Sequence, residues 1–145
     1  MKKDVNGDLK NGVFQEGECV CIYKDGKIHC ENGPAKINFK KNVDGSLTIQ
    51  QKSWYLNDEL HREDGPAIEY SDGGKEWWIN GERHRDDGPA CIYKDPDEGD
   101  FFYEWFRNGG RVTEQEIEQF IVKKNLNEKL HVTLAEKHRE KRAKI

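Results

Sequence analysis

The chain is short of the residues that build a thick hydrophobic core. Of its 145 residues, 34% are hydrophobic and 36% are charged. Leu, Ile, Val and Phe together make up about 21% of the chain, just above the roughly 20% at which disorder becomes the default state. This composition excludes a large helical enzyme, and the length fits a single domain.

Long apolar segments are also missing. No run approaches the roughly 18 apolar residues that a membrane span requires. The first residues are basic, but Asp4 and Asp8 occupy the stretch where a signal peptide would be apolar. We therefore expect a cytoplasmic protein, in the host cytoplasm if it is viral, with reduced cysteines at four positions: Cys19, Cys21, Cys30 and Cys91.

Aromatic rings and glycine are what the chain does have. It contains 4 Trp, 5 Tyr, 6 Phe and 14 Gly. Aromatic side chains bury a large area per residue, and glycine permits tight turns. The sequence therefore predicts a small, turn-rich β protein with a thin core.

An internal repeat organises most of the chain. Residues 54–67 (WYLNDELHREDGPA) return as residues 77–90 (WWINGERHRDDGPA), with nine of fourteen positions identical at an offset of 23 residues. A weaker copy covers residues 22–35, and a truncated one begins at Trp105. We predict a β-repeat body over residues 1–112, with these repeats: 22–39, 54–70, 77–93 and a partial copy at 105–112.

Each copy contains a tight-turn signal. Asp25-Gly26 and Asn80-Gly81 favour type I′ turns, because both central residues must adopt positive φ. Asn57-Asp58 is a weaker version of the same turn. A two-residue loop fixes the strand register, so Trp78 is expected to face Arg83. An Asp-Gly-Pro-Ala or Asn-Gly-Pro-Ala corner follows each hairpin and leads into the next strand.

The period and the motif resemble MORN repeats. The likeness is greater to the MORN-like variant W-Y-x-N-G-x-x-H-R-x-D-G-P-A found in phage, giant-virus and some bacterial proteins. It covers roughly residues 19–112 and departs from the motif in the first copy, where Cys30 replaces Arg and Asn32 replaces Asp. The resemblance implies an elongated antiparallel β-meander of stacked hairpins. It also implies a role in protein contacts, sometimes in lipid binding or dimerisation, and it brings no catalytic residues.

Beyond residue 112 the pattern acquires a helical period. Thr113 and Glu116 form a capping-box signature. Three apolar residues then share one helix face: Ile117, Phe120 and Ile121. Asn125 and Asn127 interrupt the pattern, so we expect two helices, about 114–124 and 127–141. The predicted fold is thus mainly β with C-terminal helices, in which residues 113–145 form a helical cap and a basic tail.

The net charge is unevenly distributed. Residues 123–145 hold eight basic and three acidic side chains, a net charge of +5. Because the whole chain carries −4, residues 1–122 carry −9. The basic tail either packs on the acidic body or contacts a partner, nucleic acid being possible and a membrane unlikely. Its candidate contact residues are Lys137, Arg139, Lys141 and Arg142.

A recurring trio of side chains has the chemistry of acid–base catalysis. It occurs once in each of the two strong copies: His61, Arg62 and Asp64, then His84, Arg85 and Asp87. An active site is rarely built twice in tandem, so we interpret the trio as structural. In that interpretation the His stacks on Trp, the Arg pairs across the sheet with Glu76 facing Arg85, and the Asp caps the corner. No catalytic residue is predicted.

The cysteines and His29 have the chemistry of zinc ligands. However, Cys19 and Cys21 have a strand spacing, and the expected register places Cys21 opposite Cys30. A close thiol pair of this kind is more often packing, or an incidental disulfide after oxidation, than a metal site. We predict neither a metal nor a cofactor.

The sequence thus indicates a non-enzymatic protein-interaction module. In its sharpest form the hypothesis is a small phage or viral protein that binds and inhibits a host protein. The alternatives are a nucleic-acid-associated protein that uses the basic tail, and a generic scaffold or dimerisation module, since open sheet edges make a homodimer possible. The expected binding surface is an outward aromatic face with interleaved arginines: Tyr23, Tyr55, Trp78, Arg83, Phe106 and Arg107.

Overall fold

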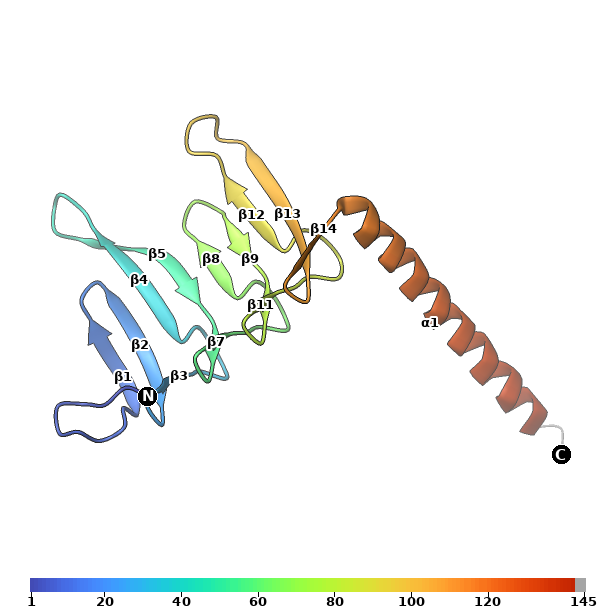
Figure 1. Ribbon diagram of the computed structural model, residues 1–145, viewed down its shortest axis with the longest axis horizontal. Helices are drawn as coiled ribbons and strands as arrows, with labels where there is room; N and C mark the ends of the chain where they lie inside the picture. The colour runs from blue at the N-terminus through green and yellow to red at the C-terminus, as the bar shows by residue number, and fades with distance from the viewer. Residues whose placement is uncertain (143–145) are drawn as a thin grey trace.

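The computed structural model describes residues 1–142 and shows a mainly β protein with a single C-terminal helix (Figure 1). The side chains of Lys141 and Arg142, two of the four basic-tail candidates, lie outside the described set. The predicted β-meander of antiparallel strands is confirmed. The strands form an elongated sheet, and the helix projects from its C-terminal end.

The main sheet has ten strands, in the order β1-β2-β4-β5-β8-β9-β12-β13-β14 with β3 added to β2. Its members are β1 (Gly12–Glu16), β2 (Cys19–Lys24), β3 (Lys27–Ile28), β4 (Lys36–Lys41), β5 (Leu47–Ser53), β8 (Ile68–Tyr70), β9 (Lys75–Glu76), β12 (Cys91–Lys94), β13 (Phe101–Arg107) and β14 (Gly110–Val112). Two small hairpins accompany it: β6 (Tyr55–Leu56) with β7 (Glu59–Leu60), and β10 (Trp78–Ile79) with β11 (Glu82–Arg83).

The turns form as the sequence predicts. Asp25, Asn57 and Asn80 have φ of 51°, 53° and 50°, in the left-handed region that a type I′ turn requires. The expected pairing of Trp78 with Arg83 is confirmed. The corners are equally regular, because the alanine that ends each one is 0% exposed: Ala35, Ala67 and Ala90. Three of the buried hydrophobic residues are thus the same small residue at the same position of successive repeats.

The helix differs from the prediction. Residues Glu114–Arg142 form one continuous helix, α1, with Asn125 inside it. A single Asn lowers helix stability by no more than about 0.7 kcal/mol relative to Ala and keeps the backbone hydrogen bonds, so it does not break the helix. The capping box is confirmed, because the Thr113 N–H donates to Glu116 Oε2 at 2.7 Å and the Glu116 N–H donates to Thr113 Oγ1 at 3.2 Å.

The expected pair of Cys21 and Cys30 does not form. Strand pairing in that hairpin stops at Ile28, and the Cys30 N–H donates instead to the carbonyl of Tyr55 in the next hairpin, at 3.1 Å. The Cys21 sulfur lies 3.8 Å from that of Cys19. All four cysteines are free thiols, and burial raises the pKa of Cys21 and of Cys91.

Candidate protein-interaction surface

Adjacent repeats are joined by a histidine. The Asn80 N–H donates to His61 Nδ1 at 3.1 Å, and the Asn80 side-chain oxygen Oδ1 lies 2.8 Å from the same nitrogen. Backbone bonds support this contact: the Arg62 N–H donates to the Trp78 carbonyl and the Gly81 N–H to the Leu60 carbonyl. The same contact occurs at three boundaries, which we call the histidine joints: His29–Asn57, His61–Asn80 and His84–Asn108.

Arginine, not histidine, covers the tryptophan of each strong repeat. The Arg62 guanidinium lies 4.1 Å from the ring centre of Trp54, and that of Arg85 lies 3.9 Å from the ring centre of Trp77. Arg85 Nε also donates to Asp87 at 2.7 Å. The expected pair of Glu76 with Arg85 is therefore wrong, because Glu76 pairs with Arg83 and Arg85 with Asp87. Each arginine instead holds its own Gly-Pro corner against the tryptophan.

These contacts leave one groove on each side of the second Gly-Pro corner, which is formed by residues 64–67. One groove has a volume of about 790 Å³ and is lined by Trp54, Arg62 and the corner after the first hairpin. The next has a volume of about 600 Å³ and is lined in the same way by Trp77 and Arg85, with Lys124 of α1 at its end. Exposed carboxylates rim both grooves: Glu31, Glu63, Asp64 and Asp87.

The predicted aromatic face is mostly a packing layer. Tyr23 is only 3% exposed, so its placement on an outward face is wrong. Arg83 is sandwiched between Trp78 and Phe106, 5.0 and 5.3 Å from their ring centres. Tyr55 is half-buried, and burial raises its pKa. The structure brings Trp78, Arg83 and Phe106 together as predicted. They form a packed cluster that stabilises the hairpins and not an outward binding face.

A buried carboxylate organises that cluster. Glu76 is 4% exposed and accepts hydrogen bonds from Tyr70 at 2.7 Å, Trp78 at 3.0 Å and Arg83 at 3.3 Å. Arg83 also donates to the Tyr93 hydroxyl at 3.1 Å. Burial of the ring and the contact with Glu76 raise the pKa of Tyr70. A buried charge with this many partners specifies one arrangement of the surrounding rings.

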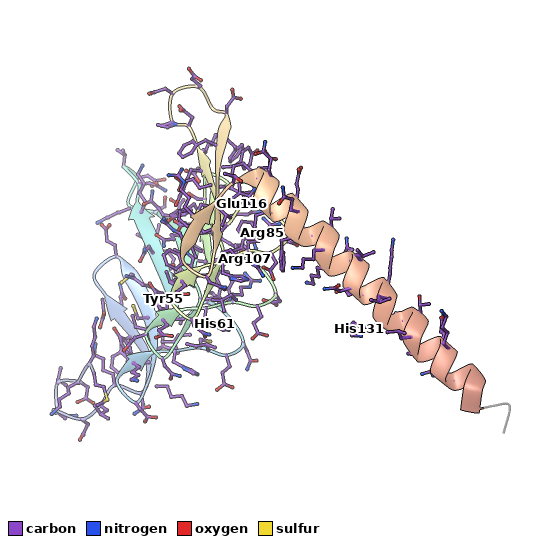
Figure 2. All side chains as sticks on the ribbon, turned by 45° about the vertical axis from the view of Figure 1, so that its right-hand side comes forward. Tyr55, His61, Arg85, Arg107, Glu116 and His131 are labelled. Atoms are coloured by element: carbon purple, nitrogen blue, oxygen red, sulfur yellow. The ribbon has the colours of Figure 1, made fainter. Side chains whose placement is uncertain are left out.

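Arg107, the sixth predicted contact residue, belongs to the root of the helix. Its guanidinium lies 3.4 Å from the ring centre of Phe120, and its Nε donates to Asp86 at 3.0 Å. Ile117 is 3% exposed beside it. Figure 2 shows Arg107 and Arg85 near the start of α1 and His131 far out along it. The first turns of α1 thus cover the end of the body, as the sequence predicts, and the remainder projects.

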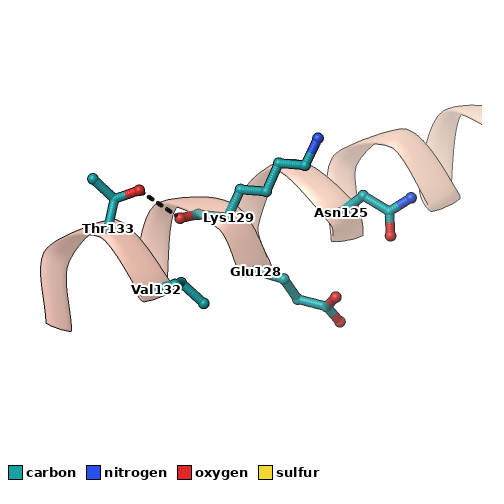
Figure 3. Close-up of a pocket in the computed structure, with 5 residues that line it drawn as sticks. All are labelled: Asn125, Glu128, Lys129, Val132 and Thr133. Carbon is teal, nitrogen blue, oxygen red and sulfur yellow. Dashed lines mark hydrogen bonds between the residues drawn. The ribbon is translucent and has the colours of Figure 1, made fainter. Parts of the chain in front are cut away.

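The projecting part of α1 exposes both apolar and basic side chains. Val122, Leu126, Leu130 and Leu134 are 67%, 65%, 57% and 45% exposed. Lys137 and Arg139 are exposed as well. The hollow drawn in Figure 3 lies on one face of this helix, where the Thr133 hydroxyl donates to the Lys129 carbonyl at 3.0 Å. It has no second wall, so it is not a ligand site.

One exposed aromatic cluster escaped the sequence interpretation. Phe101, Phe102 and Tyr103 are 41%, 50% and 48% exposed, and they are consecutive in β13. The available signal was the run Phe-Phe-Tyr directly after the acidic segment 95–100. Because this run lies outside the repeat motif, the periodicity gave no reason to single it out.

Among the side chains that the structure describes, no His, Cys, Asp or Glu gather in a group of three or more that could hold a metal ion. Residues 1–142 contain no helix with the length and apolarity of a membrane span. Comparisons of the chain with protein-family models, with curated proteins and with solved structures find no match.

Proposed function

We propose that this chain is a non-enzymatic protein-interaction module of the MORN-like type. The observation that carries the proposal is the aromatic cluster of Phe101, Phe102 and Tyr103, since contiguous exposed apolar side chains characterise binding surfaces. The repeated residues with catalytic chemistry are engaged in structural contacts, with His61 in a histidine joint and Arg62 on Trp54. In its sharper form, resting on the motif alone, the proposal is a small phage or viral protein that binds and inhibits a host protein.

The test is quantitative affinity capture from native or host cells. The bait is the full chain, and its matched control carries Phe102→Ser, which removes a half-exposed ring that lies outside the repeat motif. We expect one protein to be retained in near-stoichiometric amount by the wild-type chain and depleted at least about tenfold with the variant. Absence of any protein retained above the background of an unrelated bait contradicts the proposal.

The second candidate is nucleic-acid binding through α1. It is favoured by the exposed Lys123, Lys124, Lys129, Lys137 and Arg139 on a helix that projects from the acidic body. It predicts an electrophoretic mobility shift that weakens as salt rises and is lost when residues 125–145 are deleted. The absence of a shift at low salt removes this candidate.

A further inference from the structure

Half of strand β13 has no neighbour on its outer side. β14 pairs only with Trp105, Phe106 and Arg107, whereas the four residues before them pair with β12 alone. The upper part of β13 accordingly stands free beside the start of α1 in Figure 1. We call residues 101–104 the open edge.

The register shows which backbone groups face outward. The Asp95 N–H donates to the Asp100 carbonyl at 2.7 Å. Hydrogen-bonded pairs alternate along an antiparallel ladder, so Phe102, which faces Tyr93, also bonds to β12. The N–H and C=O groups of Phe101 and Tyr103 therefore point away from β12. Within the described residues, no hydrogen bond reaches them across the open edge.

The side chains of the open edge are positioned but half exposed. Phe102 packs against Tyr93 with ring centres 5.3 Å apart, and Tyr103 lies 6.3 Å from Trp105. Phe101 lies against Gly73 in the turn between β8 and β9. Aromatic side chains stand on both faces of the strand, so an added strand would find apolar surface on either side.

Carboxylates bracket this edge at both ends. Four lie in the loop before β13: Asp95, Asp97, Glu98 and Asp100. At the other end, Glu104 closes the open edge and accepts a hydrogen bond from the exposed Arg111 at 2.8 Å, and Glu114 and Glu116 occupy the first turn of α1. This charge pattern attracts a segment with basic residues at its ends.

The same charges oppose a second copy of the chain. A two-fold pairing of two open edges joins Phe101 of one copy to Tyr103 of the other, because only these residues have outward backbone groups. That register places Asp100 opposite Glu104 on both sides of the axis, and like charges directly opposite one another destabilise a sheet. Such placement of charge on an edge is a common protection against self-association.

We propose that the open edge of β13 binds an extended segment of a partner protein as an added β-strand, and that this segment carries apolar residues at its centre and Lys or Arg at both ends. The inference rests on the proposed interaction function and specifies the chemistry of the partner. Main-chain hydrogen bonds to Phe101 and Tyr103 supply affinity, and the flanking charges supply selectivity.

The probe is the synthetic peptide Lys-Lys-Ile-Val-Ile-Lys-Lys, titrated into the full chain and followed by amide NMR. We expect the amides of Phe101 and Tyr103 to gain hydrogen-exchange protection, while that of Phe102 is already protected by β12. Two peptides are matched controls: one with Glu at the four Lys positions and one with N-methylated amides at the two Ile residues, whose N–H groups face the open edge when Val lies opposite Phe102. Equal binding of either control, or no protection of Phe101 and Tyr103 at millimolar basic peptide, overturns the proposal.

The register also supplies a backbone variant. Tyr103→Pro removes one outward N–H and leaves the bonds to β12 untouched, and Pro is tolerated on an edge strand. Its control, Tyr103→Thr, removes the same ring and keeps the N–H. We expect Tyr103→Pro to bind the peptide about threefold to tenfold more weakly than Tyr103→Thr, as the loss of one hydrogen bond implies. Equal affinities of these two variants overturn strand addition.

These results are independent of the capture experiment. A captured cellular protein together with equal binding of all three peptides would refute the open edge and keep the interaction function. If Tyr103→Pro does not fold, strand addition is tested by the hydrogen-exchange protection of the Phe101 and Tyr103 amides in the wild-type chain. Concentration-dependent dimerisation through the open edge, measured by analytical ultracentrifugation, would assign it to a second copy and refute the partner segment.

Discussion

The imidazole of His61 belongs to one repeat, and its hydrogen bonds belong to the next. Its Nδ1 accepts the Asn80 N–H, while its Nε2 lies 3.8 Å from Glu63. Both ring nitrogens of His61 therefore face polar groups of the protein itself. Residue by residue, the motif is explained by contacts that join units and not by chemistry on a substrate.

A double-mutant cycle measures this joint. His61→Ala is expected to lower the free energy of unfolding by about 1 kcal/mol, the usual net value of a hydrogen bond. Asn80→Gly keeps the positive φ of the turn and the backbone N–H but removes Oδ1, so the coupling in urea denaturation, expected at about 0.5 kcal/mol, measures the contact of the Asn80 side chain with His61. His131→Ala on the exposed face of α1 is the control and should leave stability unchanged. Additive single effects would show that the joint does not act as a unit.

The residues of the hairpins could be predicted, but their partners in the next unit could not. The turn chemistry of Asn80-Gly81 fixes the register within a hairpin, which is why the pairing of Trp78 with Arg83 was predictable. The contact of His61 with Asn80 depends on how far one hairpin is displaced from the next, and no local signal encodes that displacement. The exposure of Tyr23 was mispredicted for a second reason. The amino-terminal residues that cover its ring lie outside the repeat, so the repeat pattern says nothing about them.

The elements that carry the candidate surface are β13 and α1. β13 is seven residues long and β14 only three, so the first four residues of β13 have no partner on the side of the strand that β14 occupies. The sequence predicted strands and turns from the repeat, but the relative lengths of neighbouring strands are set by the loop 95–100 and by the start of α1. The open edge therefore became visible only in the assembled sheet.

The two parts of α1 should respond differently to change. Ile117→Ala is expected to lower the free energy of unfolding by about 2–4 kcal/mol, because it leaves a cavity where the helix meets the body. Deletion of residues 125–145 should alter the thermal midpoint of the body by no more than about 2 °C, since the described side chains beyond Lys124 are exposed. Near-ultraviolet circular dichroism and calorimetry measure both effects. A large loss of stability on truncation would mean that the projecting part packs on the body in solution.

Across the whole molecule, the two ends of the repeat body are closed in different ways. The C-terminal end is covered by the root of α1 except along the open edge of β13. At the N-terminal end, Glu16 pairs with Lys2 at 3.1 Å and with Lys10 at 2.5 Å, and it accepts a hydrogen bond from the buried Tyr23 hydroxyl. This second closure depends on one ionised carboxylate.

Acid should therefore weaken the N-terminal end. The hydrogen bond from Lys10, with smaller contributions from Lys2 and Tyr23, lowers the pKa of Glu16 from 4.5 to about 2. Because the folded pKa is the lower one, the ionised carboxylate stabilises the fold above about pH 5, and this contribution is lost as the pH falls toward 2. Allowing for the partial exposure of Glu16, the effect is about 1 kcal/mol.

The measurement compares the wild-type chain with Glu16→Gln by urea denaturation between pH 2 and pH 7. The variant should be the less stable protein at neutral pH, and the difference should disappear near pH 2. Other carboxylates titrate equally in both proteins, so the difference isolates Glu16. A difference that does not change with pH would contradict the assigned role of the charge.

The histidine joints have a consequence for how such a chain can change in length. Each internal unit carries an asparagine at its own turn and a histidine that contacts the following turn. Its asparagine can therefore bind the histidine of the preceding unit, and its histidine can bind the asparagine of the following unit. A tandem duplication of one 23-residue unit, such as the offset between the two strong copies, would therefore meet both neighbours through contacts that already exist. The array can lengthen or shorten by whole units without compensating substitutions, while the aromatic strand and the helix stay at its far end.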